Sequence, residues 1–188
     1  MKTHKILNEN MYSLKAYYMH TLKDLCKSLG GTFKEGLLGL SAICTVDLDK
    51  AMDNLDKILH TVSYTVDGKN IREMIFKNRE KELVFEKIDG YPMHIIYNIQ
   101  IGDIDIHSIS EKEEIEKKIK EVMKAVEREK ASFITTGIPV YQDTTMRKIL
   151  GLSIGASLEI RNRQELKESK RKLNRIINLL NRYERELF

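Results

Sequence analysis

The sequence predicts an α+β protein in which amphipathic helices pack on a mostly antiparallel sheet and a long helix ends the chain. Three observations favour this class. Apolar and polar residues alternate between Glu82 and His107, which is typical of strands with one exposed face. The turn residues Asp89-Gly90-Tyr91-Pro92 interrupt this alternation, which favours short connections between antiparallel strands. Apolar stripes with a period of 3.6 residues lie on both sides of the stretch and predict helices.

The alternation is clearest from Met93 to Ile101, where the odd-numbered positions are apolar and form one face. β-Branched and aromatic residues are frequent here, which favours a strand over a helix. At Gly102 the alternation shifts by one residue, so that Ile104 and Ile106 take the apolar face. Such a shift indicates either a β-bulge at Gly102 or a turn into a new strand.

The first third of the chain predicts two helices and a buried strand. A helix from about Asn10 to Leu29 is expected to end at Gly30-Gly31. The apolar run Leu37–Val46 favours a strand that is covered on both faces and therefore central in the sheet. Asp47 is then expected to cap a second amphipathic helix from Leu48 to Val62.

A hairpin is predicted next. Ser63–Val66 and Ile71–Phe76 are its expected strands, and Asp67-Gly68 is a dipeptide typical of hairpin turns. Charged residues 77–81 then connect this hairpin to the central strands.

Ser110 and Glu113 have the spacing of a capping box, which predicts a helix that runs to about Lys130. The following strand, Phe133–Tyr141, contains Pro139 and is therefore expected at a sheet edge or strand end.

The last quarter of the chain predicts a helix, a strand and a second helix. Asp143 is expected to cap a short helix through Leu150, before a glycine-containing strand over Gly151–Ile160. Asn162 and Glu165 predict the N-terminal cap of a final helix that reaches the end of the chain.

At 188 residues the chain has the length of one domain, residues 1–188. A possible seam lies near residue 130. It would separate an α+β unit, 1–130, from a strand–helix–strand–helix extension, 131–188. The charged fraction of 32% with abundant Lys, Glu and Ile is compatible with a thermophilic source.

Composition also limits the cellular setting and the partners. The net charge of +4 is too small to imply a polyanionic partner by itself. No apolar run approaches the length of a membrane span, so no membrane partner is expected. The first ten residues lack the apolar region of a signal peptide. Two cysteines do not form a disulfide framework, so we expect a soluble protein of the reducing cytoplasm.

The segment from Ile71 to Val126 carries a resemblance to a known family. It reads IREMIFKNREKELVFEKIDGYPMHIIYNI and is followed by the helix from Ser110. Its order of hairpin, turn, strand and helix resembles the second half of a roadblock-type domain, and the preceding helix–strand–helix can be fitted to the first half. The resemblance covers about two-thirds of the chain, and the tail after Lys130 lies outside it.

The chain also departs from the family's pattern. A separate opening strand pair is not evident, and the helix from Leu48 is shorter than in that family. The resemblance implies a non-catalytic homodimeric scaffold that binds small GTPases or motors.

Three polar residues suggest a metal site. Asp103, Asp105 and His107 occupy alternate positions and share one face of the predicted strand. Carboxylates and imidazole bind Zn²⁺, Mn²⁺ or Mg²⁺, and His94 is a candidate fourth ligand. This interpretation makes the protein a metal-dependent enzyme. The alternative is the solvent-exposed face of an outer strand.

A second candidate is an anion site at a strand end and helix start, where backbone amides attract negative charge. Its residues are Thr135, Thr136, Gly137, Asp143, Thr144 and Thr145. The alternative is a capped turn, in which Asp and Thr are common.

No Ser/His/Asp or Cys/His nucleophile set is present in the pattern, which favours a protein without catalysis. Cys26 and Cys44 lie in apolar runs, where a thiol is expected to be buried and inert. No cofactor is indicated.

The final helix carries two stripes. The apolar stripe repeats every seven residues, as in a coiled-coil seam, and predicts a homodimer or packing on the protein's own sheet. It comprises Leu166, Leu173, Ile176, Leu180, Tyr183 and Leu187. The polar stripe combines long cations with asparagine, which suit nucleic-acid phosphates and base edges. It comprises Arg163, Lys167, Lys170, Arg171, Asn174, Asn178, Arg182 and Arg185.

These patterns favour a cytoplasmic, non-catalytic interaction or regulatory protein that forms a homodimer or binds a protein partner. The alternatives are a nucleic-acid-binding protein that uses the final helix and a metal-dependent enzyme that uses Asp103, Asp105 and His107.

Overall fold

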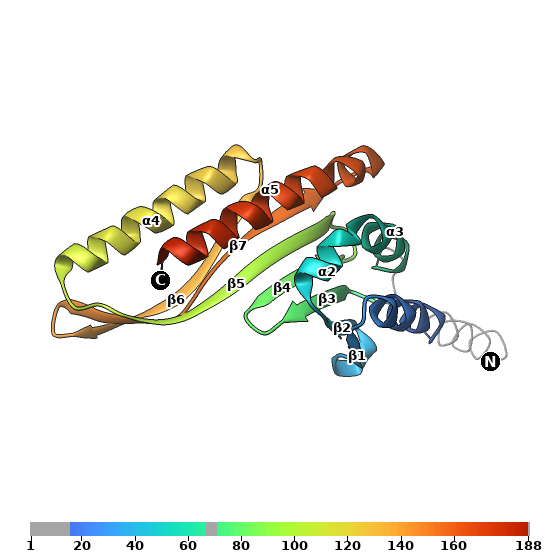
Figure 1. Ribbon diagram of the computed structural model, residues 1–188, viewed down its shortest axis with the longest axis horizontal. Helices are drawn as coiled ribbons and strands as arrows, with labels where there is room; N and C mark the ends of the chain where they lie inside the picture. The colour runs from blue at the N-terminus through green and yellow to red at the C-terminus, as the bar shows by residue number, and fades with distance from the viewer. Residues whose placement is uncertain (1–15, 67–70, 188) are drawn as a thin grey trace.

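The computed structural model describes residues 16–66 and 71–187 of the chain, which form one seven-stranded sheet with helices packed on it (Figure 1). The strand order is β1-β2-β3-β4-β5-β7-β6. Neighbouring strands are antiparallel except β2 and β3, which are parallel. The predicted α+β class with a mostly antiparallel sheet and a long final helix is confirmed.

The strands are β1 (Thr32–Glu35), β2 (Ser41–Thr45), β3 (Glu73–Asn78), β4 (Lys81–Glu86), β5 (Met93–Asp105), β6 (Ser132–Gln142) and β7 (Thr145–Ile160). The helices are α2 (Leu48–Asp53), α3 (Leu55–Val66), α4 (Ile109–Arg128) and α5 (Arg163–Leu187), with a 3₁₀ turn η1 (Leu37–Gly39) and a helical segment over 16–28. β6 and β7, which follow the possible seam at residue 130, pair into the same sheet as β1–β5. Among the described residues, no helix is both long and apolar enough to cross a membrane.

One row of side chains, the cross-sheet row, passes through all seven strands on the helix-covered face. It consists of Phe33, Cys44, Phe76, Leu83, Tyr97, Ala156 and Phe133. The five inner members are buried, and the phenylalanines at its two ends are half-buried. In Figure 1, α4 and α5 lie along β5, β7 and β6, whereas α2 and α3 lie over the other end of the sheet. All of these helices therefore share one apolar core.

Tyr97 joins the cross-sheet row to α5. Its hydroxyl donates a hydrogen bond to Asn181 Oδ1 at 2.7 Å. Burial, followed by the negative charge of Glu184, raises the pKa of Tyr97, so the hydroxyl stays protonated and remains a donor.

The two cysteines form a disulfide, with the Cys26 and Cys44 sulfur atoms 2.03 Å apart. The bond ties the helical segment 16–28 to β2 inside the core, where both residues are fully buried. The expectation of two free, inert thiols is therefore wrong, because the fold places side chains 18 positions apart in the sequence next to each other. The expectation of a reducing cytoplasm rested on free thiols, and the disulfide removes that support.

Several predicted elements differ from the structure in the first half of the chain. Leu37–Val46 forms η1 followed by β2, which lies next to the edge strand β1 and not at the sheet centre. The helix expected over Leu48–Val62 is divided into α2 and α3 at Asn54. Ser63–Val66 continues α3, because Val62 and Val66 extend the apolar face begun by Ile58 into the core. The expected Asp67-Gly68 turn lies outside the described residues.

One helix cap and one turn also differ from prediction. The helix α4 is capped by Ser108, whose Oγ accepts a hydrogen bond from the Glu111 amide at 3.1 Å. The Ser-x-x-Glu spacing occurs twice here, and the pair Ser108 and Glu111 forms the cap in place of Ser110 and Glu113. Asp143 adopts a positive φ of 56° in the β6–β7 hairpin turn, and residues 145–150 belong to β7 and not to a short helix.

The alternation shift at Gly102 is a β-bulge. The register between β5 and β7 slips on both sides of Gly102, whose φ of 104° suits glycine. β5 therefore continues through the shift to Asp105. Pro139 lies in β6, at the sheet edge as expected.

The apolar stripe of α5 packs inside the chain. Leu173, Ile176 and Leu180 are buried against the sheet and α4, and Leu166, Tyr183 and Leu187 pack at the margin of the same core. Leu173 and Leu180 of the predicted seam are therefore not available to a second copy. The interpretation of this stripe as packing on the protein's own sheet is the one that holds.

Replacing Leu173 by Ala is expected to lower the free energy of unfolding by about 2–5 kcal/mol, because it leaves a cavity between α5 and the sheet. Leu173→Met, which nearly conserves volume, is the control and should cost less than about 1.5 kcal/mol. Urea unfolding measures both values. An Ala variant of unchanged stability but altered sedimentation would contradict the intramolecular packing.

Candidate functional site

The start of α5 is set by local hydrogen bonds. Asn162 Oδ1 accepts a hydrogen bond from the Glu165 amide at 2.9 Å, and Glu165 Oε2 accepts one from the Arg161 amide at 2.7 Å. These bonds satisfy free donors at the helix start, as the sequence predicts. Because the apolar stripe faces the core, the polar stripe of the same helix must face solvent.

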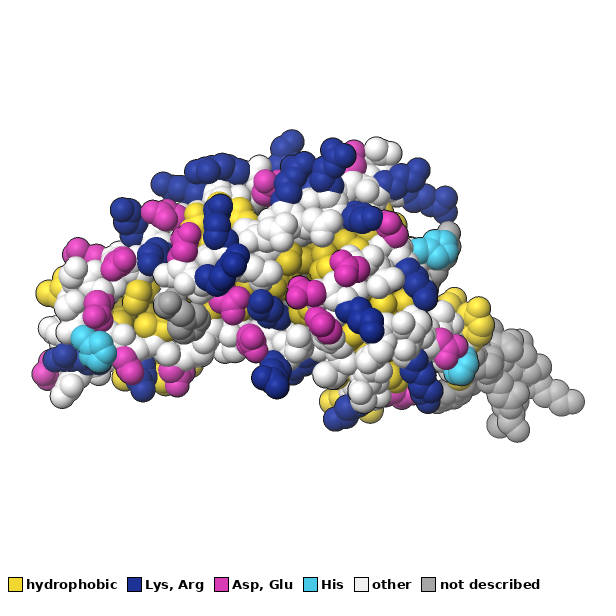
Figure 2. All heavy atoms as spheres, viewed as in Figure 1, with side chains coloured by type: hydrophobic (Ala, Val, Ile, Leu, Met, Phe, Trp, Pro, Cys, Tyr) yellow, Lys and Arg dark blue, Asp and Glu magenta, His cyan; other side chains and the backbone are white. Residues whose placement is uncertain are grey.

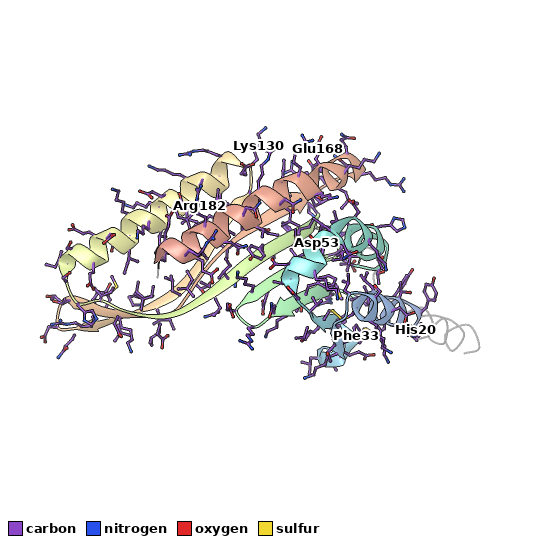
Figure 3. The ribbon with its side chains drawn as sticks, in the orientation of Figure 1. His20, Phe33, Asp53, Lys130, Glu168 and Arg182 are labelled. Atoms are coloured by element: carbon purple, nitrogen blue, oxygen red, sulfur yellow. A yellow bond between two sulfur atoms is a disulfide. The ribbon has the colours of Figure 1, made fainter. Side chains whose placement is uncertain are left out.

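The predicted polar stripe lies together on the exposed side of α5, and we call it the basic face. Its members are Arg163, Lys167, Lys170, Arg171, Asn174, Asn178, Arg182 and Arg185, of which only Lys170 is half-buried. Figure 2 shows Lys and Arg side chains gathered along the part of the surface where Figure 1 places α4 and α5. Arg182 and Glu168, labelled in Figure 3, lie in different turns of α5 and project from it.

The chain's positive charge is concentrated on this helix. α5 contains eight Lys and Arg against four Asp and Glu. The whole sequence has 32 and 28, so the other residues carry 24 cationic and 24 anionic side chains and are neutral together. The net charge of the whole chain, +4, therefore equals the net charge of α5.

Most cations of the basic face have no acidic partner among the described residues. Lys170 is an exception and lies 2.6 Å from Asp56 of α3. The Arg182 guanidinium lies over the Tyr183 ring at 5.2 Å from its centroid. Within residues 16–66 and 71–187, Arg163, Lys167 and Arg171 form no ion pair. Their charges are therefore available to a ligand.

A groove opens where α5 begins, and we call it the α3–α5 groove. It lies between α3, the β4–β5 connection with the first residue of β5 (87–93), and residues 160–170, which run from the end of β7 into α5. Its volume is about 860 Å³, within the range of pockets that bind small ligands. The cationic side chains that line it are Lys87, Arg161, Arg163, Lys167 and Lys170. Asp56 is its acidic lining residue, so the groove favours anions.

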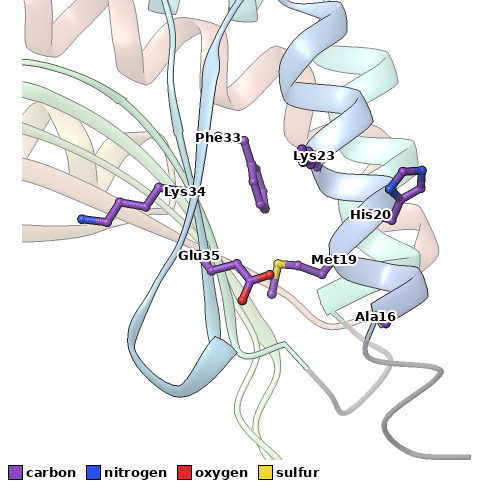
Figure 4. Close-up of a pocket in the computed structure, with 7 residues that line it drawn as sticks. All are labelled: Ala16, Met19, His20, Lys23, Phe33, Lys34 and Glu35. Carbon is purple, nitrogen blue, oxygen red and sulfur yellow. The ribbon is translucent and has the colours of Figure 1, made fainter.

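A smaller hollow of about 360 Å³ lies between the helical segment 16–28 and β1 (Figure 4). Phe33 and Met19 project into it, whereas Lys34 projects from the opposite side of β1. Its charged residues are of both signs, and His20 lies 3.4 Å from Asp24. This mixture favours no particular class of ligand.

The structure does not assemble the predicted metal site. Asp103 Oδ1 accepts a hydrogen bond from the Gly151 amide at 2.9 Å, and Asp105 pairs with Lys148 at 3.5 Å. His94 lies nine residues before Asp103 on the same strand, roughly 30 Å away at strand rise. His107 follows β5 and is exposed. Across residues 16–66 and 71–187, no group of three or more His, Cys, Asp or Glu has the geometry to hold a metal ion.

The predicted anion site is also divided. Thr135 donates to the Ser153 carbonyl oxygen at 2.8 Å, and the Thr136 hydroxyl lies 2.6 Å from that of Ser153. These bonds hold β6 against β7, next to Gly137. Asp143 and Thr144 form the β6–β7 hairpin turn, and Thr145 begins β7. No helix starts at this turn. The free backbone amides of a helix N-terminus, which are expected to bind the anion, are therefore not present at this turn.

Sequence reasoning missed Lys87, Tyr91 and Arg161 as groove residues. The sequence predicts that Tyr91 lies in a turn, but its place in a groove with the start of α5 depends on the pairing of β5 with β7. No spacing in the sequence indicates this proximity.

Comparisons with known proteins give no relative: no family model matches the chain, and no match was found among curated proteins or solved structures. The resemblance to roadblock-type domains therefore stays a prediction from the order of elements.

The face of the sheet opposite the helices carries an acidic row. Glu73, Glu86, His94 and Glu159 are consecutive partners on β3, β4, β5 and β7. Partial burial raises the pKa of Glu73, and the charges of Glu86 and Glu82 raise it further.

This raised pKa predicts a pH dependence of stability. The folded protein binds the Glu73 proton more tightly than the unfolded chain, so the free energy of unfolding should fall as pH rises from the ordinary to the raised pKa. Glu73→Gln should reduce this fall and increase stability at neutral pH. Urea unfolding between acidic and neutral pH measures the effect, with Glu127→Gln on the exposed side of α4 as control. Parallel stability curves for wild type and Glu73→Gln would refute the assignment.

Proposed function

We propose that this chain is a nucleic-acid-binding protein that contacts its ligand with the basic face of α5. The observation that carries the proposal is the concentration of the chain's net positive charge on one helix, α5, most of whose cations lie on the basic face. Phosphate contacts by Lys and Arg supply most of the affinity of nucleic-acid-binding proteins, whereas polar side chains can reach base edges.

The dimensions of α5 suit this role. Its 25 residues span about 37 Å, which is long enough to follow several phosphates. Asn174 and Asn178 lie between cations near the middle of the basic face, where amide groups can pair with base edges. The apolar residues on the opposite side of α5 are buried and anchor the helix on the sheet, so its position does not depend on the exposed charges.

Reversing two charges of the basic face tests the proposal. Lys167→Glu with Arg171→Glu should weaken binding to a labelled RNA or DNA by roughly tenfold or more in low salt, because two phosphate contacts become repulsive. The slope of log affinity against log salt should fall by about 2. Fluorescence anisotropy over a salt series measures both quantities.

The matched control reverses two exposed cations of α4, Lys117→Glu with Lys120→Glu, and so makes the same change in net charge. This variant should bind almost as wild type does. Equal losses in the two variants would show that total charge, and not the basic face, governs binding. A wild-type protein that does not bind at low salt would refute the proposal.

A second candidate function, a self-associating interaction protein, is favoured by the two sheet edges. The edge strand β1 has four residues, including Lys34 and Glu35, and such short charged edges resist pairing. The edge strand β6 has 11 residues and no charged side chain, in a chain that is 32% charged. Ile138 and Tyr141 of β6 are large, apolar and exposed.

Pro139 removes one amide donor and the register shifts twice along β6, but the edge still offers uncharged backbone groups to another strand over a length of about 36 Å. A second copy is the proposed occupant, because antiparallel pairing of β6 with itself across a two-fold axis needs only one self-complementary segment. The absence of charge removes the repulsion that two identical charged edges would create. This surface replaces the α5 seam as the site of homodimerisation.

Ile138→Lys should convert a dimer to a folded monomer. A lysine on the β6 edge would have to be desolvated, and would repel its copy, when two edges pair. Sedimentation velocity measures the change. Ile109→Lys is the control, since Ile109 is 70% exposed on α4 and Ile138 is 66% exposed. A wild type that sediments as a monomer at high concentration, or a dimer that Ile138→Lys leaves intact, would refute this candidate.

A further inference from the structure

The α3–α5 groove combines an apolar interior with a cationic rim. Leu59 of α3, Met93 of β5, Ile160 of β7 and Leu166 of α5 contribute its apolar lining. These residues come from four elements that meet only in the folded chain. A ligand that fits must therefore offer both apolar surface and negative charge.

The cations of the rim differ in how free they are to bind a ligand. Lys170 pairs with Asp56 at 2.6 Å, and Arg161 pairs with Glu159 at 3.0 Å. Arg163 and Lys167 form no ion pair with any described residue. Lys87 also forms no ion pair with a described residue, so these three side chains supply the excess positive charge of the groove.

Tyr91 adds an exposed aromatic ring at the groove. Its side chain is 65% exposed, although its backbone is held on both sides. The Tyr91 amide donates to the Ile88 carbonyl oxygen at 3.0 Å, and Lys87 Nζ donates to the Tyr91 carbonyl oxygen at 2.6 Å. A ring on a fixed turn loses little freedom when a ligand stacks on it.

A groove lined by both an aromatic ring and unpaired cations matches the two parts of a nucleotide. An unpaired base stacks on aromatic side chains, while its phosphates are neutralised by Lys and Arg. Bases of a duplex are already stacked and paired, so they cannot enter such a groove without unpairing. An acidic peptide would use the cations but would leave the exposed ring without a partner.

We infer that the α3–α5 groove binds an unpaired nucleotide of a single-stranded nucleic acid, with its base on Tyr91 and its phosphates on Arg163 and Lys167. This inference rests on the proposed nucleic-acid-binding function. Arg163, Lys167 and Lys170 belong to both the groove and the basic face, so a strand that leaves the groove continues along α5. The protein therefore prefers single strands to duplexes of equal length.

The test compares a fluorescein-labelled 12-nucleotide single strand with the corresponding 12-base-pair duplex by anisotropy. Tyr91→Ala should weaken single-strand binding roughly tenfold, the loss expected for one stacked base, and leave duplex binding unchanged. Tyr91→Phe should bind as wild type does, because stacking needs the ring and not the hydroxyl. Tyr17→Ala is the control, since Tyr17 is 66% exposed and lies outside the groove lining.

A further variant separates the two proposals. Arg182→Glu with Arg185→Glu changes the basic face outside the groove and should weaken binding of both nucleic acids. If it does so while Tyr91→Ala binds both as wild type does, the groove inference is overturned and the proposed function stands. Equal losses for single strand and duplex in Tyr91→Ala overturn the inference as well. If wild type binds neither nucleic acid, both proposals fail.

Discussion

The fold depends on a sheet whose helices all cover one face. The cross-sheet row joins seven strands into one buried band, and Tyr97 near its centre is bonded to Asn181 of α5. Each helix gains stability only by turning an apolar stripe toward this face. The same requirement determines where the polar residues of every helix must go.

The exposed basic face of α5 is a consequence of this constraint. Burial of Leu173, Ile176 and Leu180 orients the helix, and the cations between them are then displayed along its outer side. Each buried apolar side chain of this size contributes about 1.5–3 kcal/mol. An exposed ion pair such as Lys170 with Asp56 contributes at most about 1 kcal/mol. Apolar burial therefore decides the position of α5, and its charges can serve a ligand.

The sheet also creates the two other surfaces of interest. β7 returns beside β5 and brings residues 160–170 next to the β4–β5 turn, which forms the α3–α5 groove. The same hairpin places β6 at the free edge, where its uncharged sequence has no neighbour within the described chain. The α3–α5 groove and the free edge of β6 thus come from one topological choice, and they lie on different parts of the sheet.

Local patterns in the sequence determined the class of fold, most strands, the final helix and the division of α5 into apolar and polar stripes. These features depend on periodicity and capping, which involve residues within a few positions of one another. Tertiary structure alone decided that Val62 and Val66 extend α3, that Cys26 meets Cys44, and that the apolar stripe of α5 faces its own sheet. Tertiary structure also placed His94 and Asp103 far apart on β5, and it placed Tyr91 and Arg163 in the lining of one groove. These outcomes depend on strand order and register, which arise from burial shared by the whole chain and leave no local pattern.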